Sequence, residues 1–139
     1  MTMMWPTNSI SSRMSTAIIR DYRDLMVWQQ AMELALASDQ VADQLPRNSW
    51  RLASQIRSAA NSIHANIAEG NGSFSLGDYL HRLSTANGSL RELESHLVFV
   101  SKRHSTIDVS QARKLSLRVT VLLAGLVRSL RTKREREGS

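Results

Sequence analysis

The chain has 139 residues, 42% of them hydrophobic, and a formal net charge of +6 at pH 7. This length favours one domain with a sizeable core. The lack of cysteine excludes disulfides and thiolate metal sites and fits a reducing compartment. No apolar run approaches the roughly 20 residues of a membrane span. The sequence therefore predicts a cytoplasmic protein without a membrane segment.

The first 20 residues differ in composition from the rest of the chain. Residues 1–20 are rich in Ser, Thr and Met and show no sustained apolar period. This composition predicts a disordered or extended arm, and the segment lacks the apolar stretch of a signal peptide. Met14 is a candidate natural start, which would make the preceding residues an upstream extension.

The first helix is predicted from about Tyr22 to Gln44. Its apolar stripe comprises Leu25, Trp28, Met32, Ala35 and Ala42. Asp39 interrupts this face. Pro46 ends the segment, because the residue before a proline is pushed out of the α region.

The second helix is predicted to begin after Asn48 or Ser49, either of which can act as an N-cap. Its apolar stripe comprises Leu52, Ile56, Ala59, Ile63 and Ile67. Gly70 is predicted to end the helix in the left-handed conformation that glycine adopts without a Cβ penalty.

The third helix is predicted over residues 76–103. Ser75 and Asp78 form a start that resembles a capping box. The apolar stripe has unbroken spacings of four and three and comprises Tyr79, Leu83, Ala86, Leu90, Leu93, Leu97 and Val100. This regularity favours packing in a bundle. The small residues Gly88 and Ser89 are interpreted as a place where a neighbouring helix approaches closely.

The fourth helix is predicted from a second capping-box-like start at Asp108 to about Lys133. Its stripe comprises Ala112, Leu115, Val119, Leu122 and Leu126. Its middle is apolar on more than one side, which indicates more than one neighbour, and one of these could be another subunit. Residues 134–139 are predicted to be a charged, flexible tail.

Four helices joined by short links predict an all-α fold, an antiparallel up-down-up-down four-helix bundle over residues 21–133.

The sequence contains no motif that indicates catalysis. No Gly-x-Ser-x-Gly elbow or Gly-Lys-Ser/Thr phosphate loop occurs, and no two histidines have metal-ligand spacing on a helix. We therefore expect no enzyme activity, no cofactor and no metal site.

Asn66 and Glu69 lie three residues apart, just before the glycine stop. If buried, they need partners, and Arg57 and Arg91 are candidates. The favoured interpretation is a polar clamp that fixes the turn between the second and third helices, with Asn66, Glu69 and Gly70 as a structural motif. The alternative is a ligand site.

Positive charge is concentrated in the last part of the chain. Residues 102–139 contain ten Lys or Arg and three acids, a charge of +7, whereas residues 1–101 carry −1. The ten are Lys102, Arg103, Arg113, Lys114, Arg118, Arg128, Arg131, Lys133, Arg134 and Arg136. They form either a solvated helix face with a basic tail or a polyanion-binding surface. Because only Phe99 supplies an aromatic ring past residue 80, contact with nucleic acid would be mainly to phosphate.

Several separate motifs resemble the 23S rRNA-intervening-sequence protein family, also called the four-helix-bundle protein family. The matching segments are residues 22–29, 55–57, 62–63, 66–70, 86 and 88–94. The resemblance spans residues 22 to 100 or so, and the last 40 residues match only in helical character. The chain departs from the family at Ser58 and Ser73, where basic residues are usual. Both changes weaken the case for phosphate contact at the end of the second helix.

The resemblance implies a bundle that assembles as a ring, a homopentamer. A related branch serves diversity-generating retroelements as an accessory protein, in which a basic pentamer engages nucleic acid and a reverse transcriptase. We therefore expect a homo-oligomeric accessory protein that contacts RNA or DNA through phosphate. The alternative is a protein-interaction scaffold for an acidic partner such as a polymerase or reverse transcriptase.

Overall fold

The computed structural model describes residues 21–138, and within this range the chain is all helical, with no strand. The elements are the 3-10 helix η1 (Tyr22–Asp24), α2 (Met26–Asp43), the 3-10 helix η2 (Arg47–Ser49), α3 (Trp50–Asn71), α4 (Leu76–Arg103) and α5 (Ser110–Gly138). The prediction of an all-α chain with four long helices is confirmed. The predicted arm, residues 1–20, lies outside the described residues.

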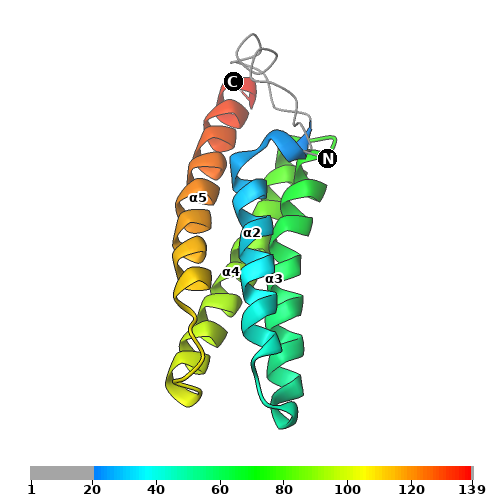
Figure 1. The fold of residues 1–139 in the computed structure, drawn as a ribbon. Coiled ribbons are helices and arrows are strands. Elements are labelled where there is room, and N and C mark those ends of the chain that lie inside the picture. Colours follow the sequence, from blue (N-terminus) through cyan, green and yellow to red (C-terminus); the bar gives the residue numbers. More distant parts are fainter. Residues whose placement is uncertain (1–20, 139) are drawn as a thin grey trace, which may run out of the picture.

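The four long helices lie side by side, and each runs back along the one before it (Figure 1). α2 and α4 each contact both α3 and α5. The helices thus surround a common core. The α2–α3 and α4–α5 links lie at one end, and the α3–α4 turn lies with the end of α5 at the other (Figure 1). Among the described residues, none of the helices has the length and apolar character needed to cross a bilayer.

α4 supplies the most regular part of the core. All seven residues of its predicted stripe are buried, and six of them, from Leu83 to Val100, have 0% exposure. Fully burying one such side chain stabilises the fold by about 1.5–3 kcal/mol. The helix start is also as predicted, because the Ser75 hydroxyl accepts a hydrogen bond from the Asp78 backbone N–H at 3.1 Å. The predicted bounds and face of α4 are confirmed.

The predicted face of the first long helix is confirmed at Leu25, Ala35 and Ala42, which are buried, but its other members need correction. The buried positions are Val27, Ala31, Leu34, Ala35, Ser38, Val41 and Ala42. Trp28 and Met32 are only half-buried, and the Trp28 ring meets the Tyr22 ring edge to face at 5.1 Å. Because α2 carries two adjacent apolar stripes, spacing alone did not identify the one that faces the core.

The predicted face and end of α5 also need correction. The buried positions are Ala112, Ser116, Val119, Leu123 and Leu130. Leu115, Leu122 and Leu126 lie at the edge of the core and are partly buried. The helix continues to Gly138, beyond the predicted end at Lys133.

Gly70 does not end α3, and this prediction is wrong. The helix continues to Asn71, and no described residue has a positive φ. Gly70 is buried inside the helix, where an added Cβ would lie 2.8 Å from Tyr79 Cδ1 and 3.1 Å from Arg82 Cβ. The glycine therefore allows α3 and α4 to approach closely. Gly88, which the sequence suggested as a contact point, is exposed and has nothing within 4 Å of such a Cβ.

Candidate nucleic-acid interface

Polar side chains join α3 to α4 at two levels, in the middle of the helices and near their turn. Asn66 is buried, and its side-chain amide donates to the Ser62 carbonyl at 2.8 Å. The Ser89 hydroxyl donates to the Ser62 hydroxyl at 2.8 Å and so connects the two helices. Glu69 is largely exposed and pairs with Arg82 of α4 at 2.9 Å. Its partner is therefore Arg82, and not Arg57 or Arg91 as the sequence suggested.

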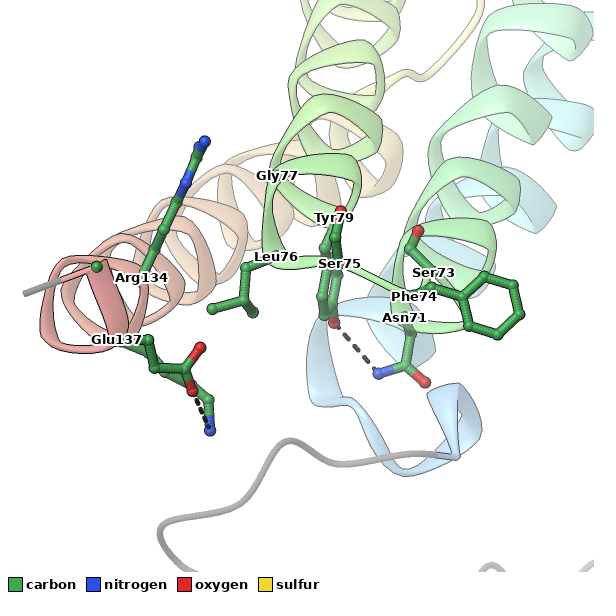
Figure 2. Close-up of a pocket in the computed structure, with 11 residues that line it drawn as sticks. Asn71, Ser73, Phe74, Ser75, Leu76, Gly77, Tyr79, Arg134 and Glu137 are labelled. Carbon is green, nitrogen blue, oxygen red and sulfur yellow. Dashed lines mark hydrogen bonds and ion pairs between the residues drawn. The ribbon is translucent and has the colours of Figure 1, made fainter.

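A cavity of about 770 Å³ lies where the α3–α4 turn meets the end of α5. In its wall the Asn71 amide donates to the Tyr79 hydroxyl at 3.3 Å (Figure 2). Burial raises the pKa of Tyr79, so this hydroxyl is neutral at physiological pH. Lys133 and Arg134 border the cavity from α5. The structure thus brings part of the predicted basic set to the α3–α4 turn.

Nine of the ten predicted basic side chains are exposed, and Lys133 is half-buried. Lys133 pairs with Glu137 at 3.7 Å, as the i,i+4 spacing predicts. Eight of the ten have no ion pair or side-chain hydrogen bond among the residues that the structure describes: Lys102, Arg103, Arg113, Lys114, Arg118, Arg128, Arg131 and Arg134.

Arginines on the other helices are mostly neutralised by acids. Arg57 of α3 binds Asp39 of α2 at 2.8 Å and also reaches Asp43. Arg91 pairs with Glu94 on its own helix at 3.3 Å. The unbalanced positive charge of the described chain therefore lies mainly on α5 and the end of α4. Such side chains are available to an anionic partner.

The free cations of α5 form two groups along the helix. Arg113, Lys114 and Arg118 lie near its start, and Arg128, Arg131 and Arg134 lie near its end. Arg118 and Arg128 are ten positions apart, which corresponds to about 15 Å of helix. Val121, between the groups, is 71% exposed, and Leu117, within the first group, is 65% exposed. Guanidinium groups so placed can make planar, bidentate contacts with phosphate oxygens.

The sequence reasoning did not include the α2–α3 link in this surface. Arg47 lies there and Arg51 follows in the first turn of α3, and neither has an ion pair among the described residues. The fold brings them to the end of the bundle that holds Lys102 and Arg103 (Figure 1). This placement follows from the alternating direction of the helices, which brings the α2–α3 link and the end of α4 to the same end of the bundle. No group of three or more His, Asp or Glu in the described part is arranged to hold a metal ion.

The family model described as the 23S rRNA-intervening sequence protein matches residues 23–128. The chain belongs to this family. The match extends past the motifs around residues 22–100 and into α5, so it includes the first basic group of that helix. Beyond the match lie Arg131, Arg134 and Arg136. A comparison with curated proteins found no match.

Proposed function

We propose that this member of the 23S rRNA-intervening sequence protein family is a non-catalytic, homo-oligomeric accessory protein that binds RNA through the basic surface of α5. The observation that carries the proposal is the set of eight exposed cations without partners among the described residues. The family name, which refers to 23S rRNA, supports an RNA-associated role in the cytoplasm.

The composition of α5 supports contact with phosphate more than with bases. The helix contains no aromatic residue that could stack on a base, and its exposed cations are mainly arginines. Each phosphate neutralised by Lys or Arg releases counterions, so affinity falls as salt rises. Binding through α5 alone should therefore be strongly salt dependent and weakly dependent on sequence.

Self-association is part of the proposal. Leu117 and Val121 expose apolar surface in the middle of α5, where the described chain offers them no cover. Burying this surface against another copy would stabilise an oligomer. In the ring of five that the family resemblance implies, each copy would contribute its net charge of +6 to one particle. A closed ring requires contacts between two different faces of the protomer.

The proposal is tested by light scattering coupled to size exclusion, with and without a structured RNA, at low and moderate salt. The variant Arg128→Gln/Arg131→Gln removes two free cations, and Arg57→Gln/Arg82→Gln removes two that are paired with acids. We expect the first variant to weaken RNA binding by about tenfold and to reduce the salt slope by about two. The second should bind like the wild type. Equal binding by wild type and the α5 variant would contradict the role assigned to α5.

A second candidate function is a protein-interaction scaffold whose basic face meets an acidic partner, such as a polymerase or reverse transcriptase. The mixture of exposed apolar and cationic side chains on α5 favours this candidate, because protein interfaces combine an apolar centre with a polar rim. Competition by unrelated RNA distinguishes the two. Unrelated RNA should displace a bound nucleic acid that is held through its phosphates. It should displace much less of a partner protein that is held by shape complementarity.

A further inference from the structure

An exposed tryptophan begins α3. Trp50 is 64% exposed, and the guanidinium carbon of Arg51 lies 5.2 Å from its ring centroid. A cation over one side of the ring holds the indole by a cation–π interaction. Among the described residues, this is the one ring contact of Trp50, so much of its aromatic surface stays open to solvent.

The register between α3 and α4 places Trp50 at the same height along the bundle as the end of α4. Ser62 lies opposite Ser89, and the two helices run in opposite directions (Figure 1). Twelve residues before Ser62 is Trp50, and twelve residues after Ser89 is Ser101. Because both helices rise by the same amount per residue, Trp50 is at the level of the last turn of α4. That turn ends with Lys102 and Arg103.

Four cations therefore lie at the same end of the bundle as Trp50. Arg47 and Arg51 come from the α2–α3 link and the first turn of α3, and Lys102 and Arg103 come from the end of α4. None has an ion pair among the described residues. The acids near this end are engaged elsewhere: Asp43 pairs with Arg57, and Asp108 accepts a hydrogen bond from the Ser110 backbone N–H at 2.9 Å. We call Arg47, Trp50, Arg51, Lys102 and Arg103 the Trp50 end.

We propose that the Trp50 end binds unpaired bases of a polynucleotide, with Trp50 stacking on a base and the four cations contacting phosphates of the same strand as it crosses this end of the bundle. An open aromatic face at an end of the bundle that carries positive charge is the chemistry that recognises single-stranded nucleic acid, because every base has a π face and every linkage a phosphate. This inference rests on the proposed function. It deepens that function by naming single-stranded loops or ends as the bound part, whereas α5 alone would bind any phosphate backbone.

The test uses the intrinsic fluorescence of Trp50. The chain has three tryptophans, so Trp5→Phe/Trp28→Phe leaves Trp50 as the sole one. This protein is titrated at low salt with a short single-stranded RNA, a single-stranded DNA and a duplex of the same length. We expect both single strands to quench the Trp50 emission and the duplex to change it little. A difference between the two single strands would show whether a ribose hydroxyl is read.

Affinity measurements on three variants complete the test. Trp50→Ala should lose about tenfold in affinity for the single strand and keep its affinity for the duplex, since stacking on an aromatic contributes that much per base. Trp50→Phe should retain much of the binding, which separates the loss of stacking from misfolding. Phe74→Ala is the matched control, because Phe74 is also exposed but lies in the α3–α4 turn at the opposite end of the bundle (Figure 1).

Three outcomes would overturn the inference. Single strands that bind without changing the Trp50 emission, and equally well to Trp50→Ala, would leave α5 as the binding surface and only this inference wrong. Emission that depends on protein concentration, with Trp50 shielded from acrylamide before any nucleic acid is added, would assign Trp50 to a contact between copies. No binding of any polynucleotide at low salt would contradict the proposed function as well.

Discussion

Replacing Gly70 with alanine tests whether the backbone of α3 at this residue lies directly against side chains of α4. An alanine Cβ would lie 2.8 Å from Tyr79 Cδ1 and 3.1 Å from Arg82 Cβ. Tyr79 is 3% exposed, and the Arg82 Cβ is fixed to the backbone of α4. Neither atom belongs to the free end of a flexible chain. The two helices would have to separate to accept the methyl group.

Two opposing effects set the magnitude. Alanine in a helix interior is about 1 kcal/mol more favourable than glycine. Overpacking a close contact costs about 1–3 kcal/mol. We therefore expect Gly70→Ala to leave the free energy of unfolding unchanged at best and to lower it by about 2 kcal/mol at worst. The polar contacts of the turn should weaken along with the helix contact.

Gly88→Ala is the matched control. Gly88 also lies inside a helix, but nothing is within 4 Å of the position that an alanine methyl group would take there, so the propensity gain of about 1 kcal/mol should appear alone. Urea unfolding followed by circular dichroism at equal protein concentration compares the two, because the stability of an oligomer depends on concentration. We expect the two variants to differ by about 1–3 kcal/mol, with Gly70→Ala the less stable. Equal stabilisation by both alanines would refute the close approach at Gly70.

Three further predictions concern stability. Leu93→Ala should lower the free energy of unfolding by about 2–5 kcal/mol because Leu93 is fully buried, while Leu36→Ala on the exposed side of α2 should change it by less than about 0.5 kcal/mol in the same urea titration. Burial lowers the pKa of His64, so the folded state favours its neutral form. The free energy of unfolding should therefore be constant above the unfolded pKa of about 6.5 and decline as pH falls below it. Thermal melts at a series of pH values should show a smaller decline in His64→Gln. Glu69→Gln breaks an exposed ion pair and should cost less than about 1 kcal/mol by urea unfolding; a larger loss would mean that the pair with Arg82 is structurally important.

The sequence predicted α4 almost to the residue because a single stripe of strict spacing leaves one possible buried face. α2 and α5 carry more than one apolar stripe, and only the positions of the neighbouring helices select the buried one. Gly70 was misassigned for a similar reason. A glycine followed by Asn71 and Gly72 has the pattern of a helix stop, and only the tertiary contact with Tyr79 reveals its other use.

Exposure of the cations on α5 could be predicted because no acids lie at helical spacing from the first basic group. Their role in binding nucleic acid stays a prediction. The partner of Glu69 could not be predicted, because Arg82 reaches it only through the register of two helices. The Trp50 end was missed for the same reason, since it joins residues about fifty positions apart in the chain.

α5 is longer than α2, one of the helices it packs against, with 29 residues against 18. Its last buried residue is Leu130, and the family match ends two residues earlier, at Arg128. The final turns of α5 therefore contribute little to the core. Substitutions there should therefore alter the charge of the bundle's surface with little folding penalty, so the surface of this extension can be changed while the bundle is kept.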